Sequence, residues 1–415
     1  MLTGYTILAA IGVIAAVALI LVALLLLVKK KVAPSGKVRI DLNDGRKVIE
    51  AEPGGSLMAT LAAEDIFLSS ACGGKASCGQ CKVQVTEGGG EILPTEQGFF
   101  SRKQIKDDWR LGCQVKVKDN LKIQVSESAL SVKRYQCQVI SNKNVATFIK
   151  EFTVRLPQGE HMDFRSGQYI QIDVPAFHLY FKDIEVEPQY RAEWEKNGFF
   201  GLECVNAEPT TRAYSMASYP AEGDIIKLNV RIATPPRGMQ VPPGVASSYI
   251  FTRKSGDTVT ISGPYGEFLL PQDDPADTEY VFIGGGAGMA PLRSHIMHLL
   301  RTLRTTRKVS FFYGARSLVE AFYLEDYAAL EAEFPNFSFH LALDRPDPAA
   351  DAAGVAYTAG FVHNVLNDTY LKDHPAPEDI RYFMCGPPMM VSSVNTLLDS
   401  LGVPPENILY DNFGN

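Results

Sequence analysis

Residues 281–291 read Val-Phe-Ile-Gly-Gly-Gly-Ala-Gly-Met-Ala-Pro, in which a short apolar run passes directly into a glycine-rich turn. The apolar residues predict a buried strand, and the residues after the turn predict the start of a helix. A turn of this kind presents backbone N–H groups at a helix N-terminus, where they attract an anion. The stretch therefore predicts a strand–turn–helix unit with an anion site, although a glycine-rich turn alone does not identify the ligand.

The same alternation of strand and helix continues on the C-terminal side of this unit. Apolar strands are predicted around Phe311, Phe339, Phe383 and Leu409, and a helical segment follows each of the first three. Such alternation is typical of a doubly wound parallel sheet, and it predicts an α/β domain over residues 273–415. Ligands of these sheets bind beyond the carboxyl ends of the strands.

Three groups of candidate residues lie at those strand ends. They are Gly286, Gly288 and Pro291 in the first turn, Gly314 and Arg316 after the second strand, and Cys385, Gly386 and Pro387 after a later strand. Arg316 could reach a 2′-phosphate or pair with a diphosphate, so the residues alone leave open whether a bound dinucleotide carries a 2′-phosphate. Cys385 taken alone could also be a small buried residue.

Residues 131–272 contain closely spaced strand signals, which predict an antiparallel β-barrel. One strand carries Arg212, Tyr214 and Ser215. Because alternate residues of a strand share a face, Arg212 and Tyr214 should point one way and Ser215 the other. A guanidinium can bind a flavin phosphate, a phenol ring can stack on the flavin, and a hydroxyl can reach a ring nitrogen. Taken alone, the pattern also fits an ordinary surface strand.

A second segment of the barrel region begins a predicted helix. Gly244 follows a Pro-Pro turn, and Ser247 and Ser248 stand in the first helical turn. A helix N-terminus with glycine and serine suits a pyrophosphate, but a simple capped helix start uses the same residue types.

In their order and spacing, these motifs resemble the ferredoxin–NADP reductase superfamily. The matching patterns are R-x-Y-S, G-x-x-S, G-x-G-x-x-P and C-G-P-P. The resemblance implies that the first two motifs hold FAD, that Asn229, Val230 and Arg231 contact its adenosine half, and that Cys385 lies beside the nicotinamide. It also implies that Phe413 covers one flavin face, where ordinary packing of a terminal strand is the alternative.

Four cysteines precede the barrel. Cys72, Cys78 and Cys81 follow the spacing C-x5-C-x2-C in a glycine-rich loop, and Cys113 comes later. Three thiolates on one loop and one distant thiolate suit a [2Fe–2S] cluster, with zinc and disulfides as alternatives. Residues 37–130 resemble ferredoxin domains of the β-grasp type, which implies an α+β fold. The longer first spacing is that of vertebrate-type and hydroxylase ferredoxins rather than of the plant type.

The beginning of the chain contains an uncharged apolar stretch, Ile7–Val28, followed at once by Lys29, Lys30 and Lys31. A helix of this length measures ~33 Å, enough to cross the hydrocarbon core of a bilayer. A signal peptide would carry its basic residues before a shorter apolar run. Because lysine flanks stay cytoplasmic, residues 1–31 predict a single-pass anchor with the other domains on the cytoplasmic side.

The composition limits the classes of partner. The 415 residues include 40 Lys and Arg against 47 Asp and Glu, a net charge of −7, and no extended basic block. This balance argues against nucleic acid as a partner. The segments together predict a multidomain protein with one N-terminal transmembrane helix, a ferredoxin domain, an FAD barrel and a doubly wound nucleotide domain.

Over essentially its whole length, the chain resembles the F subunit of the sodium-translocating NADH:quinone reductase. The anchor, the C-x5-C-x2-C loop, an insertion at residues 177–211 and the final Asp-Asn-Phe-Gly stretch carry the resemblance. It implies NADH as donor, then FAD, a [2Fe–2S] cluster and integral-membrane subunits that reduce ubiquinone and move sodium in a bacterial inner membrane. The alternatives are a membrane-attached reductase component of a hydroxylase or desaturase system, and a non-enzymatic assembly subunit that has kept a redox fold.

Overall fold

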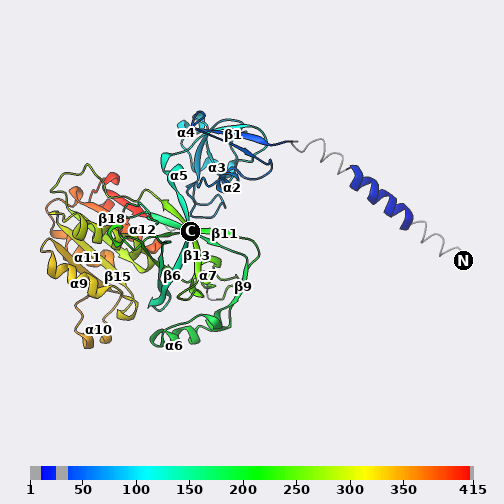
Figure 1. Ribbon diagram of the computed structural model, residues 1–415. Coiled ribbons are helices and arrows are strands. Elements are labelled where there is room, and N and C mark those ends of the chain that lie inside the picture. The colour runs from blue at the N-terminus through cyan, green and yellow to red at the C-terminus, as the bar shows by residue number, and fades with distance from the viewer. Residues whose placement is uncertain (1–10, 25–35, 237, 412–415) are drawn as a thin grey trace. The chain divides into compact units, whose positions relative to one another are not determined.

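The computed structural model describes residues 11–24, 36–236 and 238–411 (Figure 1). The chain divides into two compact units. One contains Met1–Leu68 and Gly79–Leu130, and the other contains Ser69–Cys78 and Ser131–Asn415. The first is built on a mixed sheet, and the second contains a barrel and a parallel sheet.

Residues 11–24 form a helix in which every side chain is exposed, including that of Leu19 at 70%. No helix among the described residues is long and apolar enough to cross a membrane. The predicted span Ile7–Val28 is described only over this central part. Its two ends and the lysine flank lie outside the described residues.

The first unit is built on a five-stranded sheet with the order β2-β1-β5-β3-β4. Its strands are β1 (Val38–Leu42), β2 (Lys47–Ala51), β3 (Lys82–Glu87), β4 (Trp109–Leu111) and β5 (Leu121–Gln124). The strands β1 and β5 pair in parallel, and the other neighbours are antiparallel. The mixed sheet confirms the α+β fold that the ferredoxin resemblance implies.

Short helices complete this unit. They are α2 (Leu57–Ala63), α3 (Pro94–Gln97), α4 (Arg102–Lys106) and α5 (Glu127–Ser131). Ser56 begins α2, because its hydroxyl accepts a hydrogen bond from the N–H of Ala59 at 3.3 Å. Leu57 and Leu61 are one helical turn apart, and both are fully buried.

The barrel of the second unit has six antiparallel strands in the order β11-β8-β13-β6-β7-β12. They are β6 (Lys133–Ala146), β7 (Ile149–Arg155), β8 (Tyr169–Val174), β11 (Thr210–Ser215), β12 (Ile225–Arg231) and β13 (Thr258–Tyr265), with α7 (Val245–Phe251) beside them. A bridge between Met216, which directly follows β11, and Leu228 in the middle of β12 joins these two strands. This contact brings the two edge strands together, so that the sheet closes as predicted.

The insertion forms a small substructure of its own. It consists of β9 (Phe177–Tyr180), the 3-10 turn η1 (Phe181–Asp183), α6 (Pro188–Lys196), the 3-10 turn η2 (Phe199–Gly201) and β10 (Glu203–Asn206). The strands β9 and β10 make a two-stranded antiparallel sheet. Phe181, Ile184 and Trp194 are buried and belong to the hydrophobic core of the barrel. The insertion therefore shares the core of the barrel.

The C-terminal part of the second unit is a six-stranded parallel sheet in the order β17-β16-β15-β14-β18-β19. Its strands are β14 (Tyr280–Gly285), β15 (Val309–Ala315), β16 (Phe337–Leu343), β17 (Thr358–Ala359), β18 (Arg381–Cys385) and β19 (Ile408–Asp411). Its helices are α8 (Met289–Met297), α9 (Leu324–Glu333), α10 (Pro348–Ala353), α11 (Val362–Thr369) and α12 (Pro388–Ser400) (Figure 1). This part is called the nucleotide lobe.

Alternate residues of the central strands pack into different hydrophobic clusters. Phe282 and Phe383 belong to one cluster with residues of α8 and α9, whereas Ile283 and Met384 belong to another with residues of α11 and α12. Successive strand residues point to opposite faces, so both faces of the sheet are covered. The predicted doubly wound α/β fold is confirmed.

Candidate functional site

The R-x-Y-S strand, β11, lies at one edge of the barrel. Arg212 and Tyr214 lie opposite Ile172 and Ile170 of β8, so they share a face of the strand. The guanidinium of Arg212 donates to the carbonyl oxygen of Thr211 at 2.7 Å and remains half-exposed. Burial raises the pKa of the Tyr214 phenol, which therefore stays protonated.

Ser215 connects the barrel to the nucleotide lobe. Its hydroxyl donates to the carboxylate of Asp411 at 2.8 Å, and the parallel pairing of β18 with β19 places Asp411 opposite Cys385. Burial raises the pKa of Asp411, and the hydrogen bond from Ser215 opposes this rise. Burial, and then the charge of Asp411, raises the pKa of Cys385 well above its ordinary value. The cysteine is therefore a neutral thiol.

Asp411 was not among the residues that sequence reasoning selected. The available signal was its position two residues before Phe413, in the segment that the family resemblance places at the flavin. Phe413 itself lies outside the described residues. Its role at the flavin face stays a prediction.

A buried amide beside this strand suits a polar ligand. Gln171 of β8 lies opposite Ala213, and its side-chain nitrogen has no hydrogen-bond partner among the described residues, although the residue is only 6% exposed. A buried donor without a partner is costly, so a bound group that accepts a hydrogen bond would stabilise it. Because Gln171 pairs with Ala213, its side chain lies on the same face as Ser215, so this orphaned donor fits a flavin group that approaches β8 and β11 from that face.

The strand predicted to contact adenosine, β12, presents its residues in different directions. Val230 is fully buried in the barrel core, whereas Arg231 is exposed. The side-chain amide of Asn229 donates to the hydroxyl of Tyr323 at 2.8 Å. Of the three side chains, only that of Arg231 is therefore open to a ligand in solution.

The predicted pyrophosphate segment is tightly packed. Gly244 precedes α7, and a Cβ atom there would approach the Cβ of Ala233 to 2.6 Å. The hydroxyl of Ser247 accepts from the N–H of Ala233 at 3.1 Å and donates to the carbonyl of Gly244 at 3.1 Å. Ser248 is fully buried. The hydroxyls of this segment thus serve internal packing, and a ligand would meet backbone groups.

The glycine-rich turn has one open and one crowded position. Gly286 has φ +55°, and the nearest atom to a Cβ there would be Cδ1 of Ile149 at 3.8 Å. At Gly288, a Cβ would lie 2.2 Å from the carbonyl oxygen of Cys385. The turn therefore packs directly on the C-G-P-P segment and leaves backbone free near Gly286, which is the arrangement an anion cradle needs.

The other candidate residues of the nucleotide lobe are also of two kinds, closely packed and exposed. Pro291 is buried in α8, and a Cβ at Gly314 would meet the Cβ of Val362 at 3.0 Å. A Cβ at Gly386 would meet Cε of Met390 at 2.5 Å. By contrast, Arg316 and Pro387 are exposed. Close packing at Pro291, Gly314 and Gly386 requires small or rigid residues, whereas the exposed Arg316 and Pro387 can reach a ligand.

The cysteine loop within Ser69–Cys78 is shaped by residues with positive φ. Gly73 has φ +65°, Gly74 has φ +85° and Ala76 has φ +56°. The sulfur atoms of Cys72 and Cys78 lie 3.4 Å apart. Burial raises the pKa of Cys72, but hydrogen bonds from the backbone N–H groups of Ser77, Cys78 and Lys75 and from the Cys78 thiol outweigh it and lower the pKa to about 6. A loop that favours the thiolate suits an iron ligand.

The other two cysteines belong to the first unit. Cys81 is 1% exposed and Cys113 is 7% exposed, and the amide of Gln114 lies 3.8 Å from the sulfur of Cys113. Across the described residues, no group of three or more His, Cys, Asp or Glu side chains is arranged to hold a metal ion. The ligand set of the cluster stays a prediction from the sequence.

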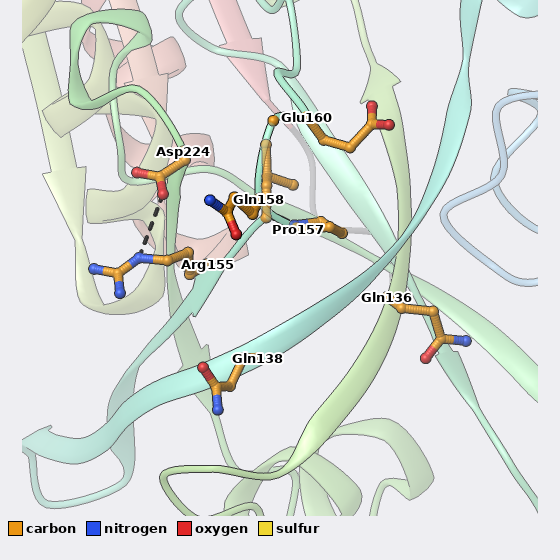
Figure 2. Close-up of a pocket in the computed structure, with 9 residues that line it drawn as sticks. Gln136, Gln138, Arg155, Pro157, Gln158, Glu160 and Asp224 are labelled. Atoms are coloured by element: carbon orange, nitrogen blue, oxygen red, sulfur yellow. Dashed lines mark ion pairs between the residues drawn. The ribbon is translucent and has the colours of Figure 1, made fainter.

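A separate pocket of about 460 Å³ lies on the outside of the barrel (Figure 2). Gln136, Gln138, Arg155 and Asp224 contribute to its lining, and Arg155 pairs with Asp224 at 3.3 Å. The pocket contains none of the predicted cofactor residues.

Comparison with known families assigns each part. The 2Fe-2S iron-sulfur cluster binding domain matches residues 40–118, the oxidoreductase FAD-binding domain matches residues 199–269, and the oxidoreductase NAD-binding domain matches residues 282–396. Among solved structures, the Amycolatopsis cytochrome P450 reductase has a TM-score of 0.63 and 24% identity, covering 91% of this chain and 98% of its own. This likeness shows the fold.

Curated relatives that align over almost the whole chain are named as the F subunit of a Na(+)-translocating NADH-quinone reductase, and two of them serve as examples. The relative from Pseudomonas paraeruginosa is 52% identical over 99% of this chain and 99% of its own. The relative from Pseudoalteromonas atlantica is 50% identical over 97% of this chain and 98% of its own.

The fold and these domains define an iron–sulfur flavoprotein of the NAD-dependent oxidoreductase class. Within that class, the chain belongs to the family of the F subunit of the Na(+)-translocating NADH-quinone reductase. The family resemblance and the predicted use of a nicotinamide nucleotide, FAD and a [2Fe–2S] cluster are confirmed.

Proposed function

We propose that this chain is the NADH-oxidising, electron-input subunit of a sodium-pumping NADH:quinone reductase. The observation that carries the NADH-oxidising part of the proposal is the hydrogen bond from Ser215 of the flavin motif to Asp411, which lies opposite Cys385 of the nicotinamide motif in the paired strands β18 and β19. Relatives that match nearly the whole chain carry the name of that complex.

The proposed contacts with each group follow the motifs. The proposed FAD site comprises Arg212, Tyr214, Ser215 and Arg231, whose side chains can reach a ligand, and Asn229, Val230, Gly244, Ser247 and Ser248, which contribute backbone groups and packing. Phe413 is proposed to cover one face of the flavin ring. NADH is held by Gly286, Gly288, Pro291, Gly314, Arg316, Cys385, Gly386 and Pro387. The cluster is held by Cys72, Cys78, Cys81 and Cys113. The orphaned amide of Gln171, the open turn at Gly286 and the lowered pKa of Cys72 support these assignments.

The chemistry that the bound groups supply is hydride acceptance by FAD from NADH, followed by one-electron transfer through the [2Fe–2S] cluster. Ser215 keeps its proton directed at Asp411, which leaves the lone pairs of its hydroxyl oxygen for a ligand. Cys385 stays a neutral thiol, so it contributes packing and polarity to the site and does not act as a nucleophile. The residues of the chain thus orient the reacting groups.

We further propose that residues 7–28 anchor the chain in a bacterial inner membrane, with the domains on the cytoplasmic side. The support is physical: the described helix of residues 11–24 has no charged residue and every side chain exposed. A helix that is apolar on all sides is favourable in lipid and unfavourable in water. Integral-membrane subunits are then the acceptors of the electrons.

The test compares the chain alone with the chain in its complex. We expect NADH to bleach the flavin in both preparations, and quinone reduction to require the co-purified membrane proteins and to respond to sodium. Purification of the chain without any membrane partner, together with efficient electron transfer to a hydroxylase component, would contradict the proposed complex. Failure of NADH to bleach the flavin would contradict the site itself.

A further inference from the structure

The end of the β6–β7 hairpin, residues 144–150, is held by the insertion on one side. It consists of the last residues of β6, the two-residue turn Thr147–Phe148 and the first residues of β7, and is called the β6–β7 turn. The indole N–H of Trp194 donates to the carbonyl oxygen of Thr147 at 2.7 Å. A carboxylate oxygen of Glu187 accepts from the backbone N–H of Asn144 at 3.0 Å. The ammonium group of Lys150 donates to the carbonyl oxygen of Glu185 at 2.7 Å. Three separate hydrogen bonds therefore tie this turn to the insertion.

Trp194 is itself fixed by its surroundings. It is fully buried, and its ring packs against Phe148 at 6.1 Å, Phe199 at 5.9 Å and Phe251 at 6.0 Å between centroids. A ring enclosed by other aromatic rings has little freedom to rotate, so it presents the N–H in one direction.

The other side of the same turn meets the nucleotide lobe. The hydroxyl of Thr147 donates to the carboxylate of Glu320, which lies in the 3-10 turn η6 (Leu318–Glu320). Ala146 and Ile149 are buried in the hydrophobic cluster of the nucleotide lobe. Ile149 is also the nearest neighbour of the open position at Gly286. The turn is thus a joint between the insertion and the glycine-rich cradle.

We propose that the insertion positions the nucleotide lobe on the barrel by holding the β6–β7 turn, with Trp194 as a positioning residue that acts through Thr147. The inference rests on the NADH oxidation proposed above. Hydride transfer depends steeply on the alignment of the two rings, so a small displacement of this turn should slow the transfer more than it weakens nucleotide binding.

The variants Trp194→Phe and Thr147→Val interrupt the two sides of the joint. Phenylalanine keeps an aromatic ring but lacks the N–H, and valine keeps the shape of threonine but lacks the hydroxyl. Thr147→Ser restores the hydroxyl and serves as the rescue. His178→Asn is the matched control, because His178 pairs with Glu203 at 3.0 Å across the exposed β9–β10 pair and takes part in none of the three hydrogen bonds that hold the turn.

Two measurements on the intact protein test whether the insertion positions the nucleotide lobe. In Trp194→Phe, we expect the rate of flavin reduction at saturating NADH to fall about fivefold, with little change in the NADH dissociation constant. Amide hydrogen exchange should also rise in residues 317–323, which belong to the nucleotide lobe and not to the insertion. Thr147→Val should reproduce both effects, and Thr147→Ser and His178→Asn should resemble the wild type.

Normal exchange in residues 317–323 and a normal reduction rate in Thr147→Val would overturn the inference, and this variant leaves the core of the insertion untouched. Increased exchange confined to the insertion in Trp194→Phe would mean that the insertion only stabilises the barrel, which also overturns it. If the wild type itself is not reduced by NADH, the proposed function fails, whereas the exchange measurement still reports on the joint.

Discussion

Replacing Glu96 with glutamine should destabilise the first unit by about 3–5 kcal/mol, the usual cost of breaking a buried ion pair from one side. Glu96 is fully buried, and Arg110 is 5% exposed. The carboxylate accepts from the guanidinium of Arg110 at 2.7 Å and from the N–H groups of Leu111 at 2.8 Å and Leu93 at 3.0 Å. The variant leaves the charge of Arg110 buried without its counter-charge.

The size of the effect follows from the geometry. Arg110 also donates to the carbonyl of Gly90 at 2.9 Å, so it cannot turn outward without giving up a second bond. A glutamine side chain offers one oxygen where the carboxylate offered two, and its amide would face the donors of Arg110. A loss of about 1 kcal/mol lowers the thermal unfolding midpoint of a domain of this size by about 4–8 °C. A destabilisation of about 3 kcal/mol, the lower end of the range, therefore lowers the unfolding midpoint by at least about 12 °C.

The assay heats the intact holoprotein and follows loss of the visible absorbance of the cluster, with release of flavin fluorescence recorded in parallel. The control is Glu87→Gln, since Glu87 and Lys122 form an exposed pair that should contribute little. We expect the cluster midpoint to fall in Glu96→Gln only, and the flavin midpoint to stay constant. Equal cluster midpoints in the two variants would refute the reasoning.

Four further outcomes are expected. Cys113→Ala should abolish the EPR signal of the reduced cluster while NADH still bleaches the flavin, and a normal signal would contradict the ligand assignment. Arg212→Leu combined with Tyr214→Leu should yield flavin-free protein, so a yellow product would count against the site. Deleting residues 1–31 should give an NADH-oxidising protein that no longer feeds quinone; quinone reduction at the native rate would contradict the anchor. Burial lowers the pKa of His295 to about 3 in the folded protein, whereas the pKa of a histidine in an unfolded chain is ~6.5. The unfolded chain therefore binds the proton more tightly. As a result, the free energy of unfolding should fall as the pH drops below ~6.5. Thermal unfolding at pH ~7 and ~5 measures this in the wild type and in His295→Asn, and equal acid sensitivity in both would disprove it.

The fold was predictable where a local pattern determines it. The strand around Phe282 and Ile283 is apolar at every position, because both faces of a parallel sheet are covered, and the structure places these two residues in different clusters. Gly288 was predicted from the motif to belong to the nucleotide site. The structure shows a steric reason for a glycine there, because a side chain would collide with the carbonyl of Cys385. Constraints of this kind depend on a few consecutive residues, so they can be predicted from the local sequence.

The site was less predictable where partners come from distant parts of the chain. Asp411 meets Ser215 only because β19 pairs beside β18 while the barrel supplies β11. The motif assigned Asn229 to adenosine, yet its amide binds Tyr323, a residue with no signal of its own in the sequence. The role of the insertion depends on contacts of Trp194 that neither composition nor periodicity specifies.

The sheet order of the first unit has a consequence for its synthesis. The strand β1 pairs with β5, with Ile40 opposite Leu121, so the middle of the sheet needs residues from both ends of the unit. A ribosome adding roughly 5–20 residues per second takes several seconds to make the intervening chain. Cys72, Cys78 and Cys81 are therefore made before the sheet can close, and, on the ligand set proposed above, the nascent chain holds only three of the four cysteines of the cluster until Cys113 is made.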